Sequence, residues 1–201
     1  MPSLSIILPH YNTPSATRAL NVCLRTLTEN TPMDYELILT AHKRREFFAY
    51  NSAAARAAGE WVVFSCTDMF FAPNWWRWID GSLDPNTALL LSVVEPAADG
   101  PVAEQAIEAE FGRTPETFNR AGFEAFAAST PLAKPVWGWG FPLIVNRQRF
   151  LDVGGFPLER VNANFADIEF LQAWEREGFQ QRRIPHYVYH LCKWTLTGEG
   201  R

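Results

Sequence analysis

The sequence has few cysteines, no long apolar run and no excess of basic residues, and each shortage excludes a class of protein. Cys23, Cys66 and Cys192 are the three cysteines, and they lie too far apart to resemble a metal site or a disulfide framework. Such a scattered set is typical of reduced thiols, so we expect a cytoplasmic protein. Because no apolar run approaches the roughly 20 residues of a membrane span, we expect a soluble protein with no integral membrane segment. The start, Met1 to Leu4, does not resemble a signal peptide.

The bulk composition is that of a globular protein. A net charge of −4 gives no sign of a nucleic-acid groove. The 201 residues are 47% hydrophobic and 20% charged, which is enough apolar material for one domain with its own core. The sequence contains neither an internal repeat nor a low-complexity segment, so we expect a single domain over residues 1–201.

The first half of the sequence alternates strand-like and helix-like segments. Thr13 and Pro14 offer an N-cap followed by proline at the first helical position. The helix that they begin carries apolar residues on one face, at Leu20, Cys23, Leu24 and Leu27. We expect a further helix over residues 46–58, closed by Gly59, and strands at 4–8, 35–40, 61–65 and 88–94. Strands separated by helices predict an α/β domain with a mostly parallel central sheet flanked by helices.

The pattern loosens between Glu95 and Pro135, where prolines and a glycine interrupt it. We interpret residues 95–135 as a variable insertion or lid between two halves, 1–94 and 136–201. Order then resumes with three further elements: a strand through Leu143–Val145, a turn at Gly154-Gly155 and a helix from about Ala166 to Glu177.

A single carboxylate, Asp68, follows the apolar strand that begins at Trp61. Open parallel sheets bind ligands just beyond the carboxyl ends of their strands, so Asp68 stands where a site would form. An aspartate in this position can also simply cap the following turn. For this segment alone, both interpretations stay open.

Five segments, in order, resemble those of glycosyltransferases with the GT-A fold, particularly glycosyltransferase family 2. They are the opening strand and turn at 5–12, the helix and strand at 51–64, the step at 66–68, the strand and turn at 140–156, and the segment 164–170. The resemblance covers about residues 4–80 and 137–191. It implies a single Rossmann-like GT-A domain and an inverting glycosyltransferase, which moves a hexosyl or related sugar from a nucleoside-diphosphate sugar to a hydroxyl acceptor. Residues 1–94 would then bind the nucleotide-sugar, and residues 136–201 would form the acceptor and catalytic half.

The resemblance also implies a divalent metal cofactor, Mn²⁺ or Mg²⁺, held by Asp68 with help from His190. Cys66 occupies the place of the first carboxylate of the family's metal motif, so only Asp68 remains. One carboxylate can suffice for a hard cation when water and substrate phosphates supply further oxygens. For His190, which follows an apolar strand, a structural role in the core is the alternative.

Asp167 stands where the family places its catalytic base, which would remove the proton of the acceptor hydroxyl. Asn164 and Asp167 also fit a helix N-cap followed by an acidic residue in the first turn, and a side chain folded back as a cap would not face an acceptor. Glu169 is not expected to form a dyad with Asp167, because residues two apart on a helix point to different sides.

Several other residues take binding roles from the resemblance. We expect the nucleotide to lie against Pro9, His10, Tyr11, Asn51 and Thr67. For His10 and Tyr11, an ordinary strand-ending turn is the alternative. The aspartate that many relatives carry after the second strand, to hold the base or ribose, is missing from Thr40-Ala41-His42, which predicts loose discrimination among nucleotides.

Tryptophans and a basic run complete the candidates. Trp137 and Trp139 either form a platform on which a sugar stacks or belong to the core. We expect the tryptophans at 75, 76 and 78 to pack against the sheet, and the basic run 43–45 to be a solvated loop.

Two other functions stay open. A catalytically silent module that binds a nucleotide or glycan fits the lost carboxylate at Cys66. A nucleotidyltransferase on a similar sheet fits less well, because no glycine-rich phosphate loop follows the first strand. The acceptor is equally open among a glycan, a lipid-linked glycan, a protein and a modified nucleic acid.

Overall fold

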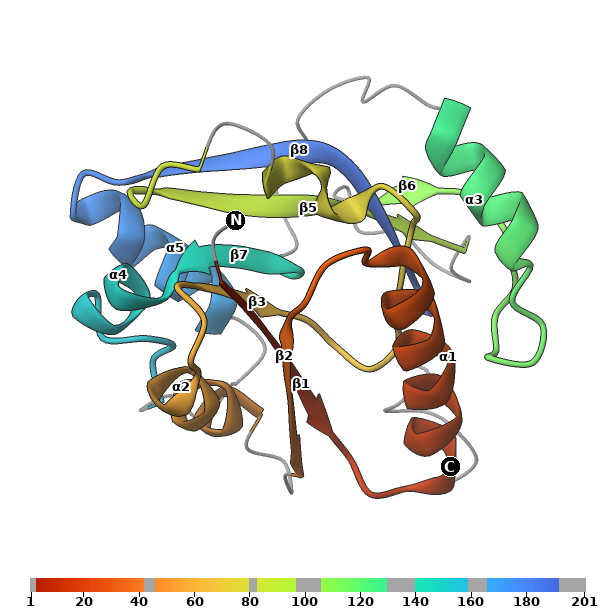
Figure 1. Cartoon of the computed structure of the whole chain (residues 1–201), viewed down its shortest axis with the longest axis horizontal. Helices are drawn as coiled ribbons and strands as arrows, with labels where there is room; N and C mark the ends of the chain where they lie inside the picture. Colours follow the sequence, from red (N-terminus) through yellow and green to blue (C-terminus); the bar gives the residue numbers. More distant parts are fainter. Residues whose placement is uncertain are drawn as a thin grey trace.

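The protein is built around a central β-sheet. The computed structural model describes residues 3–41, 46–79, 83–96, 106–129, 140–158 and 166–191. In these residues the sheet has eight strands, in the order β2-β1-β3-β7-β5-β8-β4 with β6 beside β5 (Figure 1). The strands are β1 (Leu4–His10), β2 (Glu36–Ala41), β3 (Trp61–Phe64), β4 (Met69–Phe71), β5 (Thr87–Glu95), β6 (Ile107–Glu108), β7 (Leu143–Asn146) and β8 (Gln180–His190).

Helices flank this sheet on two sides. In Figure 1, α1 (Pro14–Asn30) and α3 (Arg120–Ser129) lie at the right, and α2 (Glu46–Arg56), α4 (Arg147–Asp152) and α5 (Ala166–Arg176) lie at the left. A 3₁₀ helix, Trp75–Ile79, carries the tryptophans that were expected to pack inward; Trp75 and Trp78 are buried and Trp76 is partly buried. None of the helices in the described ranges combines the length and apolar character needed to cross a bilayer.

The α/β class is confirmed, but the sheet is mixed. Strand β1 runs parallel to β2 and β3, and β5 runs parallel to β6 and β8. Strand β7, by contrast, is antiparallel to both β3 and β5, and β4 is antiparallel to β8. The apolar pattern of a strand does not encode its direction, which explains why the sequence predicted more parallel pairing than the structure has.

The first helix begins where the sequence predicted. The Thr13 side chain accepts the backbone N–H of Ala16 at 3.2 Å, and Pro14 is the first helical residue. On the inward face, Leu20, Cys23 and Leu27 are buried against the sheet. This cap and stripe orient α1 beside the strand ends that build the site.

The sequence predicted that Gly59 closes the second helix, and this prediction is wrong. Helix α2 already ends at Arg56, and the Gly59 N–H donates to the Ser5 Oγ at 2.8 Å. A Cβ on Gly59 would lie 2.5 Å from the backbone nitrogen of Ser5. Glycine is therefore required because the chain passes close to β1, not because a helix must be capped.

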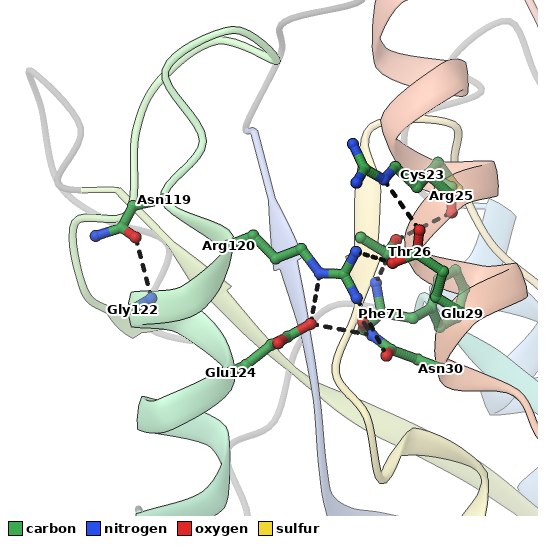
Figure 2. Close-up of polar contacts among 10 residues, drawn as sticks. All are labelled: Cys23, Arg25, Thr26, Glu29, Asn30, Phe71, Asn119, Arg120, Gly122 and Glu124. Carbon is green, nitrogen blue, oxygen red and sulfur yellow. Dashed lines mark hydrogen bonds and ion pairs between the residues drawn. The ribbon is translucent and has the colours of Figure 1, made fainter.

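The described part of the middle segment, residues 106–129, is fastened to the rest of the fold. Arg120 at the start of α3 forms an ion pair with Glu29 of α1, and its Nε lies 2.6 Å from the Oε1 of Glu124 (Figure 2). On the sheet side, the Tyr189 hydroxyl donates to the Gly112 carbonyl at 2.6 Å and accepts the Phe111 N–H. Contacts at Phe111, Gly112 and Arg120 thus tie this segment to α1 and β8.

Candidate active site

Three strand ends bring a histidine between two carboxylates. Strands β5 and β8 are parallel neighbours, so Glu95 and His190, their last residues, lie close together. Strand β4 pairs with β8 so that Met69 lies opposite His190, which brings Asp68 alongside. The Nδ1 of His190 is 2.6 Å from the Oε1 of Glu95, and its Nε2 is 3.6 Å from the Oδ1 of Asp68.

Asp68, Glu95 and His190 are all buried, so the two carboxylates act strongly on the imidazole. Asp68 and Glu95 are each 3% exposed, and His190 is 8% exposed. Burial by itself lowers the pKa of His190, but the charge of Asp68 and the hydrogen bond and charge of Glu95 outweigh it, so the pKa is raised. The site therefore favours positive charge at the place where the imidazole meets Asp68.

Cys66 contributes a neutral group rather than a replacement carboxylate. Burial and the nearby charges of Asp68 and Glu46 raise the pKa of the Cys66 thiol well above its ordinary value. Its sulfur lies 3.8 Å from the hydroxyl of Tyr50, which also donates to the Ser65 carbonyl. The step from β3 to β4 is thus held by Tyr50 of α2, with Asp68 as its acidic group.

Asp167 sits in the first turn of α5 and is held from outside that helix as well. Its Oδ2 accepts the backbone N–H of Gly140 at 3.0 Å, and the residue is 7% exposed. Burial raises the pKa of Asp167, and hydrogen bonds from the backbone N–H groups of Ile168 and Gly140 offset part of that rise. A cap-like arrangement and a raised pKa therefore coexist in the same side chain. The expected N-cap, Asn164, lies outside the described residues.

Glu46, the first residue of α2, is a site residue that sequence reasoning missed. Burial raises its pKa, a hydrogen bond from the Tyr11 hydroxyl at 3.2 Å lowers it, and the charges of Asp167 and Asp68 raise it further. Because Glu46 interacts with both aspartates, Asp68 and Asp167 belong to one site. An acidic residue at a helix start has an ordinary local explanation, so the sequence carried no distinctive signal for this role.

Glu95 was also missed, although a signal for it existed. It ends the apolar strand Thr87–Val94, just as Asp68 follows the apolar strand at Trp61. A lone carboxylate at the end of an apolar strand is the same signal in both places, although Glu95 also marks the start of the proline-interrupted segment.

Four of the five residues predicted to bind the nucleotide lie at or near the strand ends that build the site. Pro9 and His10 end β1, and Thr67 is buried beside Asp68. Burial lowers the pKa of His10, so the ring is neutral at physiological pH. Tyr11 follows and contacts Glu46 through its hydroxyl, which links the end of β1 to the acidic site.

Asn51 has a structural task that the sequence did not suggest. Its Nδ2 donates to the carbonyl of Phe156 at 2.8 Å, and its Oδ1 accepts the Phe156 N–H at 2.9 Å. A Cβ on Gly155 would lie 2.8 Å from that Oδ1, and the φ of Gly155 is +69°. Asn51 thus clamps the Gly154-Gly155 turn to α2, and its contact with a nucleotide stays a prediction.

Some predicted residues cannot be placed. Trp137, Trp139, His42 and the basic run 43–45 lie outside the described residues. Among the residues that the structure does describe, no group of three or more histidine, cysteine or acidic side chains is arranged to hold a metal ion. Asp68 and His190 are the pair that comes together.

Comparison with known proteins reveals likeness in structure but not in sequence. No family model matches the chain, and no curated protein is significantly similar to it. Its fold is similar to that of the catalytic domain of Drosophila β1,4-galactosyltransferase 7 in complex with xylobiose, with 12% identity and a TM-score of 0.56 over 91% of this chain. It is also similar to S. aureus TarS, with 14% identity and a TM-score of 0.59 over 94% of this chain, and to TarS 1–349, with 13% identity and a TM-score of 0.58 over 99%.

These likenesses confirm a GT-A-like glycosyltransferase fold. The chain spans 65% of the galactosyltransferase chain, 36% of the TarS chain and 67% of TarS 1–349. At such low identity they establish the fold and leave the residue roles to the chemistry of the site.

Proposed function

We propose that this protein is an inverting glycosyltransferase that moves a sugar from a nucleoside-diphosphate sugar to a hydroxyl acceptor, assisted by a divalent cation. The observation that carries the proposal is the meeting of Asp68 with His190 at the strand ends, in the same acidic site as Asp167. The structural neighbours are glycosyltransferases, which supports glycosyl transfer in general.

Asp68 and His190 would hold the cation, and their surroundings fit one. The Nε2 of His190 lies 3.6 Å from the Oδ1 of Asp68, which is longer than a good hydrogen bond but within ion-pair range when the ring is protonated, so positive charge is favoured between the two groups. Nδ1 is occupied by Glu95, which leaves Nε2 as the nitrogen directed at Asp68. When bound, a divalent cation would neutralise the negative charge that grows on the leaving diphosphate.

Asp167 would act as the base on the acceptor. Inversion needs one group to take the proton of the acceptor hydroxyl while that oxygen attacks the anomeric carbon from the face opposite the diphosphate. A buried carboxylate with a raised pKa is suited to that transfer, and the Gly140 N–H holds one of its oxygens in place.

The two halves of the chain would divide the substrates. Residues 1–94 carry Pro9, His10, Tyr11 and Thr67 at the strand ends, where the nucleotide would lie, and residues 136–201 carry Asp167 and the acceptor side. Trp137 and Trp139 stay predictions for stacking an acceptor sugar. The xylobiose bound to the Drosophila enzyme makes saccharides the first acceptors to test.

A catalytically silent binding module is the second candidate, and Cys66 is the observation that favours it. The neutral thiol removes one carboxylate from the metal motif and would weaken the site for a cation. Binding without turnover would then be the protein's activity.

A ligand screen followed by a turnover assay tests the proposal. Melting temperatures would be measured with UDP, GDP, CDP and dTDP, each with and without Mn²⁺. A ligand at a hundredfold excess over its Kd stabilises the native state by about 2.7 kcal/mol. The sugar forms of the nucleotide that binds would then be assayed for release of nucleoside diphosphate in the presence of saccharide acceptors.

The outcomes separate the two candidates. Metal-dependent stabilisation together with release of nucleoside diphosphate is the result expected for a glycosyltransferase. Stabilisation without release over the whole panel would favour the binding module, and absence of both would contradict the proposal.

A further inference from the structure

Glu95 is the buried carboxylate that the proposed mechanism leaves without a role. It is 3% exposed at the end of β5, and its Oε1 lies 2.6 Å from the Nδ1 of His190. We infer that Glu95 is a positioning residue: it fixes the ring orientation and tautomer of His190, so that Nε2 is presented to the cation beside Asp68. This inference rests on the proposed metal site.

The chemistry of imidazole explains why a partner at Nδ1 matters. A neutral imidazole carries its proton on one nitrogen, and only the other nitrogen has a lone pair for a metal. A carboxylate accepts hydrogen bonds, so Glu95 keeps the proton on Nδ1 and the lone pair on Nε2. Metal-binding histidines usually have such an outer partner, and removing it typically weakens metal binding about 10- to 100-fold.

The backbone around Glu95 is built to keep this geometry. The end of strand β5 is held between β6 and β8: the Ala109 N–H donates to the Glu95 carbonyl at 3.0 Å, and Val94 pairs with Tyr189. Tyr189, next to His190, is tied through its hydroxyl to Phe111 and Gly112. The middle segment therefore holds the strand ends that carry both Glu95 and His190.

A pair of Glu95 and His190 with a purely structural role would have the same geometry. The test must therefore measure the metal affinity and the tautomer of His190 directly. Mn²⁺ affinity would be measured by electron paramagnetic resonance of the free ion, in the wild type and in Glu95→Gln, Glu95→Ala and His190→Ala. Glu95→Gln keeps an oxygen that can accept from Nδ1 but loses the charge. Glu108→Gln is the matched control, because Glu108 pairs with Glu95 across β5 and β6 but is exposed.

We expect Glu95→Ala to weaken Mn²⁺ binding about 10- to 100-fold, Glu95→Gln to weaken it less, and Glu108→Gln to leave it unchanged. A Glu95→Ala protein that is folded and binds Mn²⁺ like the wild type would overturn the inference. The variant Asp68→Asn distinguishes a wrong role for Glu95 from a wrong metal site. If it lowers Mn²⁺ affinity while the Glu95 variants do not, only the role of Glu95 is wrong. If it has no effect, the proposed metal site is wrong, and the role of Glu95 with it.

The wild-type protein offers a test that no folding defect can obscure. Nitrogen-15 spectra of the metal-free protein, at a pH where the ring is neutral, report which nitrogen of His190 carries the proton; His190→Ala identifies the signals. We expect Nδ1 to be protonated and Nε2 to be bare. Protonation at Nε2 would contradict the positioning role.

Discussion

Asp68 and Asp167 are both buried carboxylates of the same site, yet the fold holds them by different means. Asp68 faces the imidazole of His190, which is itself held by the second carboxylate Glu95. Asp167 instead accepts a backbone N–H from Gly140 and lies in the first turn of α5. One aspartate is held beside a histidine and the other by backbone N–H groups, and the charges of both act on Glu46.

This difference suits two different tasks. A carboxylate grouped with a histidine and a second carboxylate forms a region of negative potential that favours a cation. A carboxylate held by neutral amide groups keeps its orientation while burial raises its pKa, which suits proton transfer. The following predictions test whether these tasks are separate, from the largest expected effect to the smallest.

Asp68→Asn should have the largest effect, because it removes the charge that would hold the cation. We expect kcat/KM to fall on the order of 10⁴-fold, since several kcal/mol of charge stabilisation are lost. Stabilisation of the protein by nucleotide should no longer depend on Mn²⁺. Steady-state kinetics and melting curves would measure both, and a variant that keeps both properties would make Asp68 a turn residue.

Asp167→Asn should lower kcat on the order of 10³-fold, within the range of about 10² to 10⁴ typical of a general base. Asparagine can still accept the Gly140 N–H, so the melting temperature and nucleotide affinity should stay close to those of the wild type. A cap without a catalytic role would behave differently: kcat would be nearly unchanged. Single-turnover kinetics beside melting curves would distinguish the two.

Gly140→Ala should disturb Asp167 without touching Asp68. The new Cβ would lie 2.5 Å from the Oδ2 of Asp167, so the carboxylate must move. A displacement near 1 Å can cost about 10²-fold in rate, and we expect a fall in kcat of that order. Metal-dependent nucleotide binding should persist. Gly122→Ala in α3 is the control, because the nearest atoms to its new Cβ would belong to the side chain of Asn119, which precedes that helix, and it should retain wild-type kcat.

Glu46→Gln should have the smallest effect and would test whether the charges of Glu46 and Asp167 are coupled. As a base Asp167 must be ionised, so activity should fall as the pH drops through its pKa, which lies above the ordinary 3.8. The repulsion between Glu46 and Asp167 acts on both groups, so removing the charge of Glu46 should lower the pKa of Asp167.

The acid limb of the kcat profile should therefore move to lower pH in Glu46→Gln, by less than about one unit. The exposed Glu60→Gln serves as the control and should leave the profile in place. A limb that moves to higher pH, or does not move, would show that Glu46 and Asp167 are not coupled.

Features with a local cause were predictable from the sequence. Thr13 and Pro14 specify the start of α1 because capping involves only neighbouring residues. The turn at Gly154-Gly155 follows from positive φ angles that glycine adopts easily. Asp68 stood out because it directly follows an apolar strand, and the order of such segments was enough to indicate the GT-A-like fold.

Features that depend on distant residues needed the tertiary structure. The direction of β7, the clamp of Asn51 on Phe156 and the meeting of Glu95 with His190, which are 95 residues apart, leave no local trace in composition or periodicity. The sequence by itself determined which strand ends carry polar groups. Only the pairing of β5 with β8 and of β4 with β8 decided that three of these groups share one site, because strand pairing depends on contacts between segments far apart in the chain.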